Sequence, residues 1–234
     1  RYNGDLVIMT TLILIAGGIL TAITIGLFEL IGFKIEQFYT EYIVVFGLAA
    51  LPIVATYITQ KNPQLVNRVS PVIAKIFSPL VLITLVVYLI AILFSGKDPY
   101  NDRDFLMVFN FLLIGVMAII LFSIAETFKK NENRTGSFIL FALSIITVIV
   151  NGIALSAILF RISAWGITPN RLAVLGGNLL MLTHLLMVTF NLFKNVSKKA
   201  GIPEVEKSIS TFLPVYILWT IIVTFIFPLL FHFK

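Results

Sequence analysis

The sequence contains no cysteine, and this absence excludes several kinds of site at once. A chain without thiols has no disulfide framework, no thiolate ligands for zinc or an iron–sulfur cluster, and no cysteine nucleophile. Histidine is also scarce, because His184 and His232 are the only two in 234 residues, so a histidine-rich metal site is not expected. The sequence therefore predicts neither a metal centre nor a bound cofactor.

Charged residues are scarce as well. They account for 12% of the chain, against 59% for hydrophobic residues, and the mean hydropathy is +1.04. Soluble domains carry about 25% charged residues, and a water-soluble fold could not cover this much apolar surface. The net charge of +6 would suggest nucleic acid in a soluble chain, but in a membrane protein it reflects cationic loops on one side. We therefore expect the lipid bilayer, and not nucleic acid, as the partner.

The apolar residues occur in runs of about 20, the length of helix that crosses a hydrocarbon core about 30 Å thick. Helices, and not barrel strands, follow from this length and from the need to pair every backbone N–H and C=O without water. The predicted fold class is all-α, a polytopic transmembrane bundle of about seven spans. The predicted spans are 6–32, 39–59, 73–94, 105–128, 137–160, 172–193 and 209–231.

The whole chain, residues 1–234, is predicted to form a single transmembrane helical domain. It begins with Arg1 rather than methionine and enters an apolar run within a few residues, so we expect it to be a fragment of a longer membrane protein. The first run is long enough to span and lacks the small-residue cleavage site of a signal peptide. Further helices upstream, or a second copy of the chain, are the expected protein partners.

A segment between the second and third spans has a different pattern. Over residues 64–76, apolar side chains such as Val69 and Ile73 recur at helical spacing, and polar side chains take the other face. This pattern is typical of an amphipathic helix in the membrane interface, before the chain turns inward at Ser78 and Pro79. The alternative is a slanted start to the third span.

The basic residues in the loops predict the orientation. On the side of the N-terminus, called side A, there are eleven: Arg1, Lys61, Arg68, Lys75, Lys129, Lys130, Arg134, Lys194, Lys198, Lys199 and Lys207. On the opposite side, called side B, there are six: Lys34, Lys97, Arg103, Arg161, Arg171 and Lys234. Because cytoplasmic loops carry the excess of Lys and Arg, the N-terminus is predicted to be cytoplasmic and the C-terminus outside.

Polar residues within the spans are the candidates for function, because their burial in hydrocarbon costs several kcal/mol unless they face a partner or water. They include Glu29, Asn110, Asn151, Asn178 and His184. At about 1.5 Å per residue most of them lie toward side B, and His184 lies near mid-bilayer. We expect them to line a cavity open to side B. The alternative is that they only hold helices together.

The sixth span places three of its residues on one face. Gly177, His184 and Asn191 are seven residues apart, so this face is expected to point inward. If Asn151 on the fifth span faces the same way, Asn151 and His184 line the cavity together. For His184 the alternatives are a neutral hydrogen bond between helices and a proton-linked or ligand-binding role.

The first span carries Gly18, Ala22 and Gly26 at intervals of four. Small residues at this spacing let a neighbouring helix approach closely. The sequence therefore predicts a helix-packing surface, used within the bundle, at a homodimer seam or in a flexing helix.

The turn before the sixth span has a specific pattern. Thr168 followed by Pro169 is typical of an N-cap and a first helical position, and Gly166 permits a tight turn before them. We therefore expect the sixth helix to start abruptly at this point.

Two arginines flank that turn. Arg161 and Arg171 lie on side B, with Trp165 suited to the headgroup level. Two guanidinium groups beside a helix N-terminus predict a site for an anion or lipid headgroup. The alternative is that the arginines anchor the helix ends at the interface.

Catalytic signatures of soluble enzymes are absent: there is no His-Glu-x-x-His motif, no phosphate-binding glycine loop and no Gly-x-Ser-x-Gly elbow. Glu29 and His184 are the obvious acid–base pair, but their depths differ by about two helical turns. No catalytic residue is therefore predicted.

At residues 166–171, Gly-Ile-Thr-Pro-Asn-Arg, the chain resembles a bacterial multi-pass membrane family known as domain-of-unknown-function 4153. The opening Gly4-Asp5 before an aliphatic helix, and Ser78-Pro79-Leu80 before an apolar helix, extend this resemblance over most of the chain. The resemblance implies a bacterial inner-membrane protein with further helices upstream. It transfers no active site.

The leading functional hypothesis is a transporter-like or receptor-like module that binds a small solute, ion or lipid headgroup in an outward-facing polar cavity. The alternatives are a non-catalytic membrane scaffold or sensor subunit, and an intramembrane lipid-modifying enzyme. Binding or transport requires Asn151, Asn178 and His184 to meet a hydrated space, whereas a scaffold requires them to be paired and dry. An enzyme would also need an acid or base, such as Glu29, beside His184.

Overall fold

The computed structural model describes residues 2–61, 69–96, 100, 103–127, 134–197 and 202–231. Across these ranges the chain is helical, with short turns and no strand. Seven helices in the described ranges are long and apolar enough to cross a membrane. The prediction of an all-α, multi-pass transmembrane bundle is therefore confirmed.

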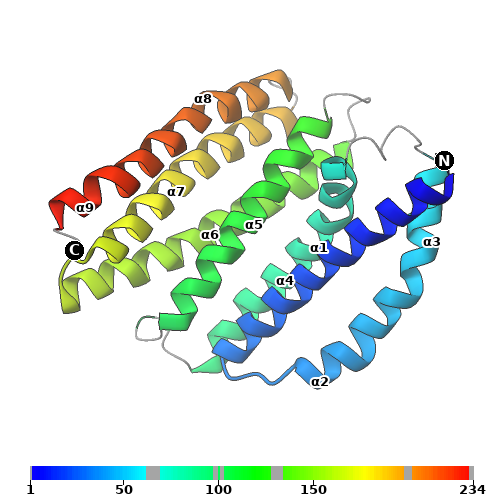
Figure 1. The fold of residues 1–234 in the computed structure, drawn as a ribbon, viewed down its shortest axis with the longest axis horizontal. Helices are drawn as coiled ribbons and strands as arrows, with labels where there is room; N and C mark the ends of the chain where they lie inside the picture. Colours follow the sequence, from blue (N-terminus) through cyan, green and yellow to red (C-terminus); the bar gives the residue numbers. More distant parts are fainter. Residues whose placement is uncertain are drawn as a thin grey trace. The chain divides into compact units, whose positions relative to one another are not determined.

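The chain divides into two compact units, Arg1–Lys97 and Asp98–Lys234. The first unit holds α1 (Tyr2–Leu30), α2 (Glu36–Phe38), the π-helical turn η1 (Tyr39–Val44), α3 (Val45–Lys61) and α4 (Val69–Ser95). Within it, α1 packs against both α3 and α4 (Figure 1). The Phe28 ring of α1 meets the buried Tyr88 ring of α4 edge-on, with centroids 5.8 Å apart.

The start of α4 decides between the two alternatives for this segment. The chain does not break at Ser78 and Pro79, because α4 is one continuous helix from Val69 to Ser95 with Pro79 inside it, which fits the alternative that this segment starts the third span. The predicted amphipathic residues from Val69 onward thus begin the same helix that forms the third span, and the remainder, 64–68, lie outside the described residues. A helix absorbs a proline in a membrane because neighbouring groups pair the carbonyl that it leaves free.

The second unit holds α5 (Arg103–Thr127), α6 (Arg134–Trp165), α7 (Pro169–Val196), α8 (Ile202–Ile221), the π-helical turn η3 (Ile222–Ile226) and α9 (Phe227–Leu230). In this unit α6 packs against α5 and α7, α7 packs against α8, and α8 also contacts α5 (Figure 1). The π-helical turn η3 ends at Ile226, two residues before Pro228, so the helix is widened in the turn that the proline ring would crowd.

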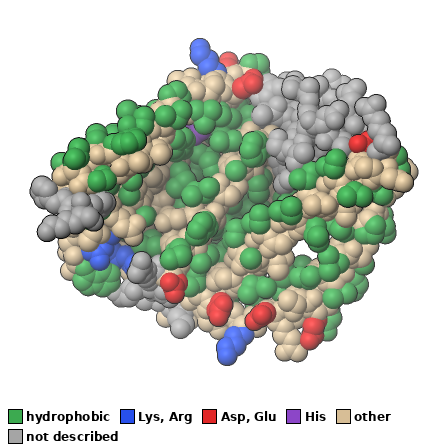
Figure 2. Space-filling view, in the orientation of Figure 1, with side chains coloured by type: hydrophobic (Ala, Val, Ile, Leu, Met, Phe, Trp, Pro, Cys, Tyr) green, Lys and Arg blue, Asp and Glu red, His purple; other side chains and the backbone are tan. Residues whose placement is uncertain are grey.

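Much of the surface left by the helices is apolar. Phe46, Leu93 and Leu229 are 69%, 80% and 76% exposed. Figure 2 shows hydrophobic side chains over the face in view, whereas the charged side chains lie near helix ends. Such a surface suits contact with lipid tails. Of the basic residues used to predict orientation, these lie outside the described residues: Arg1, Arg68, Lys97, Lys129, Lys130, Lys198, Lys199 and Lys234.

Candidate functional site

An apolar cluster forms where α5, α6 and α7 meet in the second unit. Leu106 of α5 is buried with Leu155 and Ile158 of α6, and Leu175 and Leu182 of α7 pack against them. Because the cluster draws on all three helices, it fixes which faces of α5, α6 and α7 point toward one another.

Three asparagines lie about one turn from this cluster. Asn110 follows the cluster leucine of α5 by four residues, Asn151 precedes Leu155 of α6 by four, and Asn178 lies between the two cluster leucines of α7. Residues three or four apart share a helix face, so the three amides belong to the faces that meet in the cluster. We call Asn110, Asn151 and Asn178 the asparagine triad.

The triad holds buried polar atoms that have no hydrogen-bond partner among the described residues. These atoms are Oδ1 of Asn110, Nδ2 and Oδ1 of Asn151, and Nδ2 of Asn178. Asn151 and Asn178 are 0% and 1% exposed. An unpaired buried polar atom costs about 1–3 kcal/mol. The unpaired atoms of the triad therefore form no hydrogen bond that would join the helices among the described residues.

The hydroxyl groups on the buried face of α6 behave differently. Thr147 donates to the carbonyl oxygen of Leu143 at 2.6 Å, and Ser144 donates to that of Phe141 at 2.8 Å. Serine and threonine in membrane helices commonly bond to the preceding turn in this way. These hydroxyls are satisfied within their own helix, which sets them apart from the amide of Asn151.

His184 is a residue of α7 whose fully buried side chain faces α8. Its Nδ1 is 3.1 Å from the Tyr216 hydroxyl, and its ring stacks on Phe212 with centroids 4.7 Å apart. Its Nε2 has no hydrogen-bond partner in the part of the chain that the structure describes. The Tyr216 contact matches the helix-joining alternative, whereas the unpaired Nε2 leaves a ligand-binding role open.

The face of α7 that was expected to point inward packs against α8. A Cβ at Gly177 would lie 4.0 Å from Nε1 of Trp219, whereas a Cβ at Gly176 would overlap carbons of the same ring. His184 is buried on this face and Asn191 is half-buried, so the face packs within the second unit. The cavity that His184 was expected to line with Asn151 stays a prediction. The close approach of Trp219 explains why α7 needs glycine at this level.

Asn178 and His184 lie on different faces of α7, about 120° apart around the helix axis. Because they are six residues apart, Asn178 also lies about 9 Å closer to the start of α7 than His184 does. At about 1.5 Å per residue, Asn151 lies about 21 Å from the end of α6 at Trp165, and His184 lies about 22 Å from the start of α7 at Pro169. Because α6 and α7 pack together, Asn151 and His184 are at the same level of the bundle.

The turn between α6 and α7 has the predicted geometry. Gly166 has a positive φ of 76°, which a side chain would strain. The Thr168 side chain accepts a hydrogen bond from the Arg171 backbone N–H at 3.3 Å, and Pro169 occupies the first turn of α7. The expected N-cap, helix start and glycine turn are therefore confirmed.

The two arginines beside this turn are both engaged by the protein. Nη1 of Arg171 donates to the carbonyl oxygens of Trp165 and Gly166, at 2.9 and 2.8 Å, and so caps the end of α6. Nε of Arg161 donates to the Tyr100 carbonyl oxygen at 2.9 Å. Both guanidinium carbons lie within 6 Å of the Trp165 ring centre, at 5.8 and 5.7 Å.

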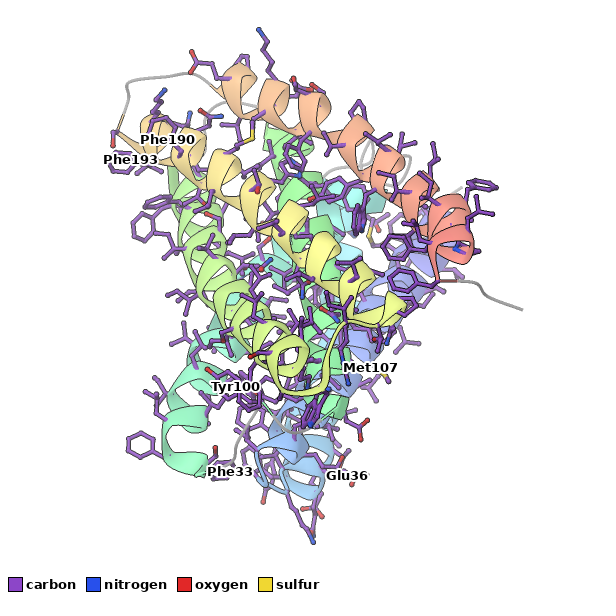
Figure 3. All side chains as sticks on the ribbon, turned by 90° about the vertical axis from the view of Figure 1, so that its left-hand side faces the viewer. Phe33, Glu36, Tyr100, Met107, Phe190 and Phe193 are labelled. Atoms are coloured by element: carbon purple, nitrogen blue, oxygen red, sulfur yellow. The ribbon has the colours of Figure 1, made fainter. Side chains whose placement is uncertain are left out.

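These contacts are what the helix-anchoring alternative requires. Tyr100 is also held by α6, because its ring meets Phe160 edge-on and its hydroxyl accepts from Ser156 Oγ at 3.3 Å. Figure 3 places Tyr100 at the end of the unit where α6 turns into α7, far along the bundle from Phe190 and Phe193. A headgroup site at the arginines stays a prediction.

The remaining candidates belong to the first unit. Glu29 is exposed near the end of α1. Gly18 and Ala22 are also exposed, and a Cβ at Gly18 would meet nothing within 4 Å; Gly26 is half-buried. The close contact predicted for this face, within the bundle or with a second copy, stays a prediction.

Sequence reasoning missed the aromatic partners supplied by α8. Phe212, Tyr216 and Trp219 recur at intervals of four and three, so they form one stripe that faces α7. That spacing was visible in the last span and would have indicated a packing face. Which polar group Tyr216 would meet could not be read from it.

A comparison of the chain with protein-family models, curated proteins and solved structures finds no match in any of the three. The resemblance to the domain-of-unknown-function 4153 family therefore stays a prediction.

Proposed function

We propose that this chain is a transporter-like or receptor-like membrane module that binds a small polar ligand among α5, α6 and α7. One observation carries the proposal: the asparagine triad holds unpaired, buried amide atoms on three helices that meet at one cluster. Burying such atoms without a partner is unfavourable, and a bound ligand or water would supply the missing hydrogen bonds.

The proposal includes a location and an orientation. Greater positive charge in the side A loops supports a cytoplasmic N-terminus, and the resemblance described above supports a bacterial inner membrane. Measured from side B, Asn110 lies about 10 Å from the start of α5, Asn178 about 13 Å from the start of α7 and Asn151 about 21 Å from the end of α6, so Asn151 is the deepest member of the triad. On this topology the ligand reaches the triad from outside the cell.

Accessibility of single cysteines to water tests the proposal, because the natural chain has no cysteine to interfere. Thiol reagents such as charged methanethiosulfonates react with the thiolate, which forms in water and not in dry hydrocarbon. Asn151→Cys and Asn178→Cys are the test positions. Leu143→Cys on α6 and Val188→Cys on α7 are the matched controls, because Leu143 and Val188 are fully buried.

We expect the two asparagine positions to react at least tenfold faster than the two controls when the reagent is added from side B. Equal, slow labelling at all four positions would mean that the triad is dry, and this result would contradict the proposal. It would favour the second candidate, a non-catalytic scaffold or sensor subunit, which is supported by the His184–Tyr216 contact between α7 and α8.

A further inference from the structure

Resting on the function proposed above, we propose that the ligand is an uncharged small molecule that carries both hydrogen-bond donors and acceptors, such as a polyol or a primary amide. The inference comes from the kind of groups that the triad presents and from the groups that its helices lack. An ion and a neutral solute need different surroundings in a membrane, so the two can be told apart.

The helices around the triad carry no fixed charge over their central parts. Residues 105–125, 135–160, 172–193 and 208–231 contain no Asp, Glu, Lys or Arg. An ion that leaves water loses solvation free energy and needs an opposite charge or several ordered dipoles in return. Arg161 and Arg171 lie outside these central parts, at the helix ends, where they donate to backbone carbonyls. A charged ligand at the triad would therefore have no counter-charge in the central parts of the surrounding helices.

The free atoms of the triad are of both hydrogen-bonding kinds. Nδ2 of Asn151 and Nδ2 of Asn178 are donors, whereas Oδ1 of Asn110 and Oδ1 of Asn151 are acceptors. An anion would use the donors and leave the acceptors unpaired, and a cation would do the reverse. A hydroxyl or carboxamide group satisfies both kinds, because it donates and accepts at once.

Discrimination by such a site is expected to be strong. A buried amide that meets a ligand without the matching donor or acceptor stays unpaired, and its desolvation is not compensated. The triad thus predicts selection for hydrogen-bonding capacity, and the absence of charge predicts rejection of ions with the same shape.

The test uses acetamide and acetate, which have nearly the same shape but differ in charge. The purified chain in lipid nanodiscs is heated while the fluorescence of Trp165 and Trp219 is followed, with acetamide, glycerol, acetate or methylammonium present. A ligand that binds the folded protein raises Tm as its concentration increases. We expect acetamide or glycerol to raise Tm, and acetate and methylammonium at the same ionic strength to leave it unchanged.

Three variants link any shift in Tm to the triad. Asn151→Leu and Asn178→Leu should abolish the shift caused by the neutral probes, because each replaces the two polar amide atoms by methyl groups and keeps the branching of the side chain. Asn191→Leu, a half-buried asparagine of α7 outside the triad, should keep the shift in full. Loss of the shift in all three variants would place binding elsewhere and overturn the inference.

The outcomes separate this inference from the function on which it rests. Stabilisation by acetate or methylammonium, and not by the neutral probes, would overturn the uncharged class while leaving a ligand site at the triad. If the triad cysteines are labelled but neither acetamide nor glycerol raises Tm, the same inference is overturned. If the triad cysteines are not labelled and no probe raises Tm, the proposed function is overturned as well.

Discussion

The Nδ1 atom of His184 lies 3.1 Å from the hydroxyl of Tyr216, and this contact joins α7 to α8. His184 is 0% exposed and stacks on Phe212, so water does not compete for the hydrogen bond. The hydrogen bond between Tyr216, in the aromatic stripe of α8, and His184 of α7 thus favours a single register between the two helices.

Tyr216→Phe should destabilise the protein by about 1–2 kcal/mol, because it leaves a buried histidine nitrogen without its partner. The measurement is equilibrium unfolding in mixed micelles, carried out as a double-mutant cycle with His184→Phe. We expect a coupling of about 0.5–2 kcal/mol between the two residues. Thr220→Val, which removes an exposed hydroxyl one turn away, serves as the control. Strictly additive effects would show that the pair does not interact.

Gly176→Ala should destabilise the α7–α8 contact by about 1–3 kcal/mol, because the new methyl group overlaps the Trp219 ring. Gly177→Ala is the matched control, since its Cβ would lie at an ordinary contact distance of 4.0 Å from the same side chain. Thermal unfolding of the two variants gives the comparison. Trp219→Leu in the Gly176→Ala background should recover part of the loss, and equal behaviour of the two glycine variants would contradict the predicted packing.

Asn151→Leu should leave stability unchanged or raise it by about 1 kcal/mol, although it changes a fully buried residue. The reason is that the amide has no hydrogen bond to lose among the described residues and escapes the cost of being buried unpaired. Unfolding in the absence of any added ligand is the measurement, with Thr147→Val as the control for a hydroxyl that is already satisfied. A loss of 2 kcal/mol or more, roughly the cost of breaking a buried hydrogen bond, would reveal a partner for this amide.

Arg171→Met should weaken the α6–α7 turn by about 1 kcal/mol, because it removes two donors from the carbonyl oxygens that end α6. The methionine keeps much of the apolar stem but has no donor. Trp165 reports the change, since its ring lies beside the guanidinium, and its emission should shift as that neighbour is lost. Unchanged stability and unchanged emission would mean that the cap contributes nothing measurable.

The orientation is tested at three positions outside the spans. Phe33→Cys and Ile167→Cys lie in turns on side B, and Ser197→Cys lies at the other end of α7. In intact cells, an impermeant maleimide should label the first two and reach Ser197→Cys only after the membrane is opened. Labelling of Ile167→Cys and Ser197→Cys from the same side would contradict a membrane-spanning α7, and labelling of Ser197→Cys alone would reverse the orientation.

The turn at Gly166, Thr168 and Pro169 shows how much local chemistry could be predicted. A glycine φ of 76°, an N-cap and a proline in the first helical turn all follow from properties of single residues and their nearest neighbours. The spans follow in the same way from the length of apolar runs. At Pro79 the expectation that a proline interrupts the helix was wrong, because α4 continues through it. Whether a proline bends or interrupts a helix depends on what surrounds it.

The functional candidates were visible in the sequence as types of residue, since polar groups are rare in these spans. Sequence alone determined that Asn151, Asn178 and His184 must each find a partner or water, because that requirement is set by the cost of burying any polar group. Only the tertiary structure decided which of them did. The hydroxyl of Tyr216, 32 positions further along the chain, contacts His184, whereas the asparagine triad is left with unpaired amide atoms among the described residues. Rotation and register of packed helices decide such pairing, and they depend on the fit of many apolar side chains at once.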